Sequence, residues 1–575
     1  MVGRLQHFLF SLSLFWAVLY ALRHYRRRRT SNAAFLPAPT SSTKSLSCEL
    51  LRSRTTRITL SKFHIGVYST AFNNVHQHFA ARLKHSRWKR LLGFAYDAGS
   101  LLGVLGMLGS VLLLLWTTLH LVSSAHVIQT PISSAPRTLH KREELFGETL
   151  LSSESSSQDA PLQLIIPGVT TPLHHLPILF AALSATQLIH EAGHAVAAAL
   201  DSVVLGSAGL GLTFILPSAF VSFAAGETES LPPRSRLRLI SAGAYHNLLF
   251  WLFLSGIAWT NVSYHVWTVL GYQDVTAYGR VVIHIDESSP LYGHLPVGSV
   301  VYKVGDDTLD GPQGAPSRWE SLLSNKRDGP APTLGWCTDE AWFAVQNATC
   351  CITRPSSSEV FMGQSCFAPI ADPSFERCVD PLLFLDAPDT RRCSSVVDCG
   401  HGQLCNRPRG DQELVSLTMH LPPWLRDGRE ADDVERRLVW QGDTSEILHE
   451  VEVGDWLPSY EVLPIGLPVL WDNLFLYLKT LSLSLYFFNL LPLPFLDGGQ
   501  LLDVLFDWYM SRGVATDGGA VMLSALEATD VEQLPNAVQR LRQGGLPKTW
   551  WTKAVHFGVG TLLACCVLLS LKSTL

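Results

Sequence analysis

The chain has 575 residues, enough for several domains, and 47% of them are hydrophobic whereas only 16% are charged. Charged residues make up about 25% of an average soluble protein, and the mean hydropathy of this chain is +0.18. Because its apolar residues are gathered in blocks, we predict a polytopic membrane protein, and the net charge of −5 gives no indication of a nucleic-acid partner.

Two apolar blocks lie in residues 1–160, which we expect to form an N-terminal anchor region with polar loops. Phe8–Leu22 is short and no small-residue cleavage site follows it, which favours an uncleaved anchor over a signal peptide. Leu101–Val122 has the length of a membrane span. Basic residues favour a cytosolic position for Arg23–Gly99, but the orientation of these two spans stays open.

Residues 161–260 are predicted to form a membrane core, and its first block, Leu173–Leu200, contains His190-Glu191-x-x-His194. Two imidazoles and a carboxylate are costly in an apolar segment and therefore suggest a functional site. On a helix, His190 and His194 project from one face and could bind one zinc ion, while Glu191 could act as a general base. The alternative is two buried histidines that only hydrogen-bond to neighbouring helices.

Two further blocks complete this core. Val203–Ala225 contains three glycines and Pro217, which is typical of a re-entrant or extended segment covered by protein or a cavity; whether it spans the membrane stays open. Leu239–Trp259 is a predicted span that contains Gly243-x-x-x-Asn247. A polar side chain such as Asn247 can join two membrane helices by a hydrogen bond.

Basic clusters at Arg234–Arg238 and Arg540–Lys553 precede the spans Leu239–Trp259 and Ala554–Leu571, and such clusters favour the cytosol. Residues 261–462 are therefore predicted to lie on the opposite side, in the lumen. Asn261 and Asn347 begin glycosylation sequons. Eight of the eleven cysteines form a Cys-rich insert at 337–405, which indicates disulfides in an oxidising compartment. They are Cys337, Cys350, Cys351, Cys366, Cys378, Cys393, Cys399 and Cys405. Their pairing stays open, and a zinc knot of Cys393, Cys399, His401 and Cys405 is the alternative.

A small β domain is predicted around this insert. We expect Tyr278–Leu323 to consist of short strands and turns, including strands at Val281–Ile285 and Ser299–Val304. Leu414–Leu421 and Glu450–Val453 could complete the domain. Such a domain could filter the substrates that reach an active site in the membrane, or it could be a purely structural luminal cap.

Residues 463–575 are predicted to form a C-terminal membrane core. Leu463–Leu496 is a span broken by prolines near its ends, and Ala554–Leu571 is the last span. A catalytic zinc ion needs three protein ligands and an open position, so Asp497 is a candidate for the third ligand. Alternatively, Asp497 caps a helix that starts near Gln500.

Three motifs together resemble the site-2 protease family of intramembrane zinc metalloproteases. They are His190-Glu191-x-x-His194, Gly243-x-x-x-Asn247 and Asn489-x-x-Pro492-x-Pro494-x-x-Asp497-Gly498. Phe63-His64-Ile65 and the luminal cysteines extend the resemblance to eukaryotic members, so it touches most of the chain from about Ser61 to the end. The chain departs from the pattern at Gly298-Ser299, where PDZ-like domains usually have Gly-Asp.

The resemblance implies one catalytic zinc ion held by His190, His194 and Asp497, with Glu191 as general base. Asn247 and Asn489 would then contact the unwound substrate or form polar contacts in the core. The implied fold is a polytopic α-helical membrane protein of six or seven apolar segments, with an inserted luminal PDZ-like β domain and the Cys-rich insert.

The implied function is intramembrane proteolysis in the Golgi or endoplasmic reticulum. The substrate would be a transmembrane helix of a membrane-tethered protein already clipped in the lumen, such as a transcription factor precursor. One alternative is a prenyl-protein-type zinc protease, whose third ligand would be a glutamate on a later helix. Another is a membrane metal transporter, but the internal repeats typical of transporters are not seen. The oligomeric state stays unknown.

Overall fold

The structure is a computed structural model. It describes residues 2–31, 48–61, 63–127, 171–224, 226–287, 289–311, 314–324, 335–352, 363–385, 391–409, 414–425, 435–442, 444–509 and 548–574. Of the basic residues used above for orientation, Arg540 and Arg542 lie outside these ranges. The chain divides into two compact units, Met1–Thr260 with Asn473–Leu575 and, separately, Asn261–Asp472.

The first unit is built from long helices. They are α1 (Val2–Ser31), α2 (Phe72–Lys84), α3 (Trp88–Val127), α4 (Leu176–Leu200), α6 (Pro233–Trp259), α13 (Leu467–Asn489), which begins in the second unit, and α16 (Lys548–Thr574); a further helix covers 497–509. Among the described residues, three helices are long and apolar enough to cross a membrane: Trp88–Ser123, Pro233–Trp259 and Trp550–Lys572. The chain therefore has the apolar helices of a multi-pass membrane protein, whereas six or seven apolar spans are not confirmed.

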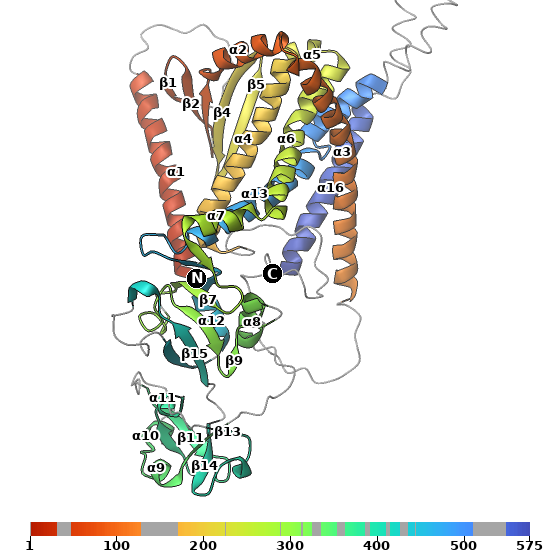
Figure 1. The fold of residues 1–575 in the computed structure, drawn as a ribbon. Helices are drawn as coiled ribbons and strands as arrows, with labels where there is room; N and C mark the ends of the chain where they lie inside the picture. The colour runs from red at the N-terminus through yellow and green to blue at the C-terminus, as the bar shows by residue number, and fades with distance from the viewer. Residues whose placement is uncertain are drawn as a thin grey trace, which may run out of the picture. The chain divides into compact units, whose positions relative to one another are not determined.

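Five antiparallel strands form a sheet beside α4 (Figure 1). In sheet order they are β1 (Cys48–Arg52), β2 (Thr56–Ser61), β3 (His64–Ser69), β4 (Leu205–Thr213) and β5 (Leu216–Phe223). The block predicted as re-entrant or extended is thus a β-hairpin. Its glycines allow close packing: a Cβ on Gly209 would meet the Val67 carbonyl oxygen at 2.1 Å and the Phe220 ring at 2.5 Å.

The N-terminal helix α1 packs on the tip of this sheet. The indole N–H of Trp16 donates to the carbonyl oxygen of Phe214 at 3.2 Å, and the Trp16 side chain is buried. The ring of Phe63 lies between Trp16 and Phe214, with centroids 5.7 Å and 4.7 Å away. Helix α1 is therefore joined to the sheet by aromatic contacts, and the uncleaved anchor stays a prediction.

Helices α3 and α6 are joined by polar contacts. The guanidinium groups of Arg234 and Arg238 both donate two hydrogen bonds to the carboxylate of Asp97. Deeper along the helices, the Tyr96 hydroxyl lies 2.8 Å from His246 Nε2. These pairs fix the rotation of α6 about its axis, and with it the face that α6 turns toward α4.

The second unit contains a β domain around one hydrophobic core. Its main sheet has the order β16-β15-β8-β7-β17, with β9 paired to β8. The strands are β7 (Arg280–Ile285), β8 (Val300–Val304), β9 (Asp307–Thr308), β15 (Leu414–His420), β16 (Glu435–Gln441) and β17 (Val451–Gly454). Beside it lie α7 (Val262–Leu270), α8 (Gly314–Leu323), α12 (Thr444–Glu450) and the pair β6 (Tyr272–Asp274) and β18 (Trp456–Pro458).

The four predicted strands of this domain agree with the structure, but the expectation of only strands and turns up to Leu323 is wrong. Residues 314–323 form α8, because Ala315, Trp319 and Leu323 recur every fourth residue and bury one helical face in the core. A PDZ-like fold is not confirmed.

The Cys-rich insert forms its own sheet, β12-β11-β14-β10-β13. Its elements are β10 (Gly335–Asp339), α9 (Glu340–Ala344), α10 (Thr349–Ile352), β11 (Ser365–Pro369), β12 (Arg377–Val379), α11 (Pro381–Leu385), β13 (Arg392–Cys393) and β14 (Gln403–Pro408). All eight predicted cysteines form disulfides: Cys337–Cys399, Cys350–Cys378, Cys351–Cys366 and Cys393–Cys405. This pairing contradicts the zinc-knot alternative.

Candidate metal centre

One helix and the start of a second bring three ligand atoms together in the first unit. His190 Nε2 and His194 Nε2, both on α4, lie 3.1 Å apart. Asp497, at the first residue of the helix 497–509, places Oδ2 3.1 Å from His190 Nε2 and 3.4 Å from His194 Nε2. Three ligands at about 2.0–2.1 Å from a tetrahedral zinc ion lie about 3.3 Å from one another. The three atoms therefore have the spacing of a zinc site.

The far nitrogen of each histidine has a different partner. His194 Nδ1 donates to the backbone carbonyl oxygen of Leu239 on α6 at 2.8 Å, which leaves the Nε2 lone pair free for a metal. His190 Nδ1 lies 3.2 Å from the side-chain amide of Asn247 and 3.5 Å from that of Asn489. Asn247 is fully buried, and its Oδ1 has no hydrogen-bond partner among the described residues. A half-turn of this amide would let Oδ1 accept the Nδ1–H of His190.

A glycine on α6 makes room for the ligands. A Cβ on Gly243 would lie 2.4 Å from His194 Nε2 and 2.5 Å from His190 Nε2. On the facing helix α4, a Cβ on Gly193 would lie 2.6 Å from the carbonyl oxygen of Ala242, which is on α6. Both positions require glycine for steric reasons. In the Gly243-x-x-x-Asn247 motif, the glycine thus admits the imidazole rings and the asparagine contacts one of them.

The donor set fits a bound cation. Within the described part of the chain, Asp497 Oδ2 is buried without an acceptable hydrogen bond, although two imidazole nitrogens face it. His194 has already used its N–H on Leu239, so a lone pair and a carboxylate oxygen face each other. Such a buried arrangement is costly unless a positive ion lies between them. Two imidazoles and one carboxylate are a common ligand set for catalytic zinc.

The cluster opens into a cavity of about 660 Å³. Glu191, His194 and Asp497 line it together with β5 and the chain after it; its wall also includes the charged Glu229, Arg236 and Asp503. The backbone N–H of Val221, on β5, donates to the Glu191 carboxylate. Glu191 therefore lies on the cavity wall beside the ligands, and this is where a general base for a zinc-bound water would have to be.

The structure thus brings together six of the predicted site residues: His190, Glu191, His194, Asn247, Asn489 and Asp497. The sequon residues Asn261 and Asn347 are exposed in the second unit. Sequence reasoning missed the Leu239 carbonyl group, which carries no side-chain signal, and the contribution of β5 to the cavity. The latter depends on a sheet whose strands lie far apart in the sequence.

Comparison with known proteins bears on this site. The family model Peptidase family M50 matches residues 178–372 and 466–525, which contain all three metal-site motifs. The similarity to the site-2 protease family is confirmed. A membrane-bound transcription factor site-2 protease homolog of Arabidopsis thaliana is 28% identical over 165 residues. That alignment covers 28% of this chain and 29% of the relative, so less than a third of the relative's length is matched. Site-2 proteases are zinc metalloproteases, in agreement with the His-His-Asp group.

Proposed function

We propose that the chain is an intramembrane zinc metalloendopeptidase. His190, His194 and Asp497 would hold the zinc ion, and Glu191 would be the acid–base residue. The observation that carries the proposal is the convergence of three ligand atoms, spaced as around zinc, at the wall of a cavity that Glu191 also lines. Helix α6, which contributes Arg236, Leu239 and Ile240 to this wall, is long and apolar enough to cross a membrane.

Zinc at this position would supply a Lewis acid that polarises a peptide carbonyl and activates water. The Glu191 carboxylate would take the proton from the attacking water and pass it to the leaving amine. The Val221 N–H holds this carboxylate on the cavity side. Asn247 and Leu239 would keep the two histidines turned so that both Nε2 atoms face Asp497.

The outer edge of β5, which pairs with no further strand among the described residues, supports a peptide as substrate. β5 is the last strand of its sheet, and its outward N–H groups are within reach of α4: Ala219 donates to Gln187 Oε1 at 2.8 Å, and Val221 to Glu191. A peptide bond inside a helix is shielded by the helix's own hydrogen bonds, so a transmembrane substrate must unwind before cleavage. An extended substrate segment beside this edge could displace these side-chain partners and replace its own lost helical hydrogen bonds with bonds to the strand.

The finer assignments rest on the family resemblance. We propose a membrane-tethered substrate that has already been clipped in the lumen, such as a transcription factor precursor, and a location in the Golgi or endoplasmic reticulum. The Cys-rich insert and the β domain would then be luminal, and Asn347 would be open to glycosylation. The four disulfides support an oxidising compartment.

Glu191→Gln tests the proposal directly. The purified full-length variant should keep its zinc and lose cleavage of a membrane-tethered substrate, because the amide cannot accept a proton. Zinc content and cleavage are measured on the same sample, with wild type as control. Full activity would refute the mechanism, and joint loss of zinc and activity would make Glu191 a ligand. Zinc flux across proteoliposomes without any cleavage would favour the transporter alternative.

A further inference from the structure

The second unit exposes apolar side chains where the chain leaves α6. Helix α7 and the segment 459–463 carry them, and we call these residues the apolar patch: Val262, Tyr264, Val266, Val269, Leu270, Tyr460 and Val462. Val269 is 87% exposed and Val462 is 91% exposed, which is unusual for aliphatic side chains that cluster. Contiguous exposed apolar surface marks a binding surface for protein or lipid.

The patch is a built surface and not a frayed end. Trp267, on the other face of α7, is buried against Tyr272 with ring centroids 5.4 Å apart. The segment 459–463 is fastened to the end of α7, since the Ser459 N–H donates to the Gly271 carbonyl oxygen at 2.9 Å. Tyr264 packs on Trp456, the first residue of β18, at 5.4 Å. Helix α7 is therefore amphipathic, with one face in the domain and the other face open.

The covalent connection limits where this patch can be. Helix α6 ends at Trp259 and α7 begins at Val262, so only Thr260 and Asn261 separate them. Two linking residues span at most about 7 Å. On the other side, Val462 precedes the start of α13 at Leu467 by a few residues. If α6 crosses a bilayer, α7 must lie at the level where α6 leaves it.

We propose that the apolar patch binds the surface of that same bilayer, with α7 lying in the interface between headgroups and acyl chains. Its composition matches an interfacial surface: the aromatic Tyr460 accompanies the aliphatic residues, and the half-exposed Tyr264 lies at the border where α7 meets Trp456. Helix α7 contains no Lys, Arg, Asp or Glu, and the one charged residue of the segment 459–463 is the exposed Glu461. Because the surface offers no positive charge, it fits neutral, zwitterionic lipid and not a layer of anionic headgroups. The β domain is thereby held at the membrane by a second contact in addition to its two chain connections.

This contact also separates the two sequons. Asn261 lies between α6 and the membrane-bound α7, whereas Asn347 is exposed in the Cys-rich insert. A bulky glycan fits at Asn347 but not at Asn261, next to the lipid headgroups.

The test uses single cysteines that carry a small fluorophore. In the full-length chain Cys48, Cys565 and Cys566, which are not among the eight disulfide cysteines, are replaced by alanine. One cysteine is then introduced by Val269→Cys or Val462→Cys. Matched controls are Val345→Cys and Val397→Cys, two valines of the insert that are 80% and 90% exposed. The proteins are reconstituted in phosphatidylcholine vesicles containing nitroxide-labelled phosphatidylcholine, and unchanged zinc content confirms that each variant is folded.

The labels at Val269 and Val462 should lose emission with nitroxide lipid and resist iodide in the water, whereas the two control labels should show the reverse. Quenching of the Val269 and Val462 labels by iodide, to the level of the controls, would overturn the proposal because the patch would face water. Protection of these two labels from both quenchers would also overturn it, because a protein would then cover the patch. Stronger quenching by nitroxide lipid after addition of phosphatidylserine would contradict the assignment to neutral lipid. No outcome depends on proteolysis, so the test is independent of the proposed function.

Discussion

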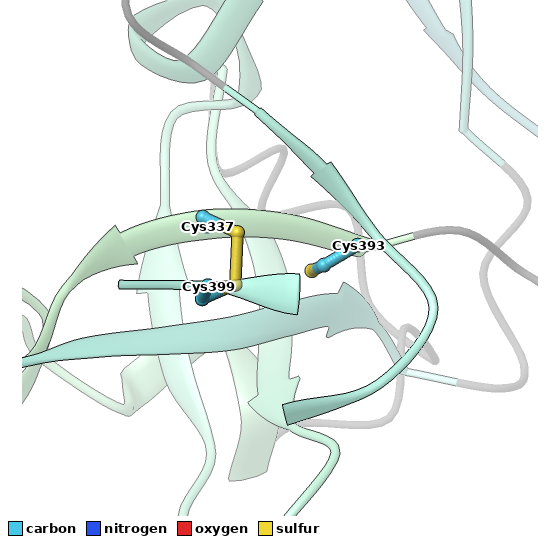
Figure 2. Close-up of side chains that lie close together, drawn as sticks. All are labelled: Cys337, Cys393 and Cys399. Carbon is cyan, nitrogen blue, oxygen red and sulfur yellow. A yellow bond between two sulfur atoms is a disulfide. The ribbon is translucent and has the colours of Figure 1, made fainter. Parts of the chain in front are cut away.

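Two regions of the molecule each bring three potential metal ligands together, but in only one of them do the ligand atoms stay unbonded. In the first unit, His190, His194 and Asp497 bring their ligand atoms within 4.8 Å of one another; in the Cys-rich insert, Cys337, Cys393 and Cys399 do the same. Figure 2 shows the sulfurs of Cys337 and Cys399 joined, with Cys393 beside them. Cys393 is itself bonded to Cys405. Proximity of ligand atoms alone therefore does not make a metal site.

The difference lies in what remains unpaired. Each sulfur of the insert has formed a covalent bond, so the cluster needs nothing further. In the first unit, a buried carboxylate oxygen and an imidazole lone pair face each other between apolar helices, and only a cation satisfies both. The insert is a small domain for which cross-links replace core size. In the function that we propose, the helical site uses its few polar groups for chemistry.

The largest effect on zinc binding is expected for Asp497→Asn. A neutral amide is a poor zinc ligand, so the zinc affinity should fall by more than the roughly 10–100-fold typical of residues that only orient a ligand. Zinc is measured by mass spectrometry and by competition with a chelator. Asp503→Asn, in the same helix and lining the same cavity, is the matched control and should keep its zinc. Stoichiometric zinc in the Asp497 variant would reduce this residue to a structural role, since asparagine also serves well at a helix start.

Gly243→Ala should come next, because its Cβ would lie within 2.5 Å of both ligand nitrogens. We expect loss of most bound zinc with the helices still folded. Gly256→Ala is the matched control: it lies on the same helix, and no other heavy atom lies within 4 Å of its Cβ position among the described residues. Both variants carry the same gain in helix propensity. Equal zinc contents in the two would show that the rings do not occupy the space above Gly243.

Asn247→Ala should have a smaller effect, about 10–100-fold on zinc affinity, because it removes a residue that turns His190 and not a ligand. Asn247→Asp can still accept the His190 N–H and should recover much of the affinity. Chelator competition on the inactive Glu191→Gln background separates this role from substrate binding. Unchanged zinc affinity in the alanine variant, together with reduced cleavage in the active background, would assign Asn247 to the substrate.

Much of the ligand cluster could be predicted from local spacing. His190 and His194 lie one helical turn apart, and such proximity is encoded within four residues. Asp497 was a candidate because proline and glycine around it break an apolar helix where a cavity must be, and the family resemblance implied that it is the third ligand. Strands such as Val281–Ile285 could be predicted from alternation and turn residues. In these cases the signal lies within a short window.

The rest depends on contacts between distant segments. β3 and β4 pair although α2, α3 and α4 lie between them in the sequence. No local pattern in the glycine-rich β4 predicts that β3 is its partner. In the sheet of the insert, Cys337 lies opposite Cys405, but its disulfide partner is Cys399. The pairing of the eight cysteines therefore depends on the three-dimensional arrangement of the insert and not on a local pattern. Helix α8 was missed because its apolar repeat covers only ten residues and its three apolar residues are stabilised by packing into the domain core.

The smallest effect on zinc is expected when the disulfide Cys393–Cys405 is removed by alanine at both positions. This bond closes a segment with a sequence separation of 12, and its loss should destabilise the insert by about 3 kcal/mol. Zinc content should not change, because no sulfur serves as a ligand. Hydrogen exchange measures the loosening of β13 and β14, with the β5 hairpin as internal reference. Conversely, a chelator should remove zinc from wild type without exposing any thiol of the insert to alkylation. Thiols released by the chelator would mean that the cysteines hold metal after all, and the contrast between the two clusters would fail.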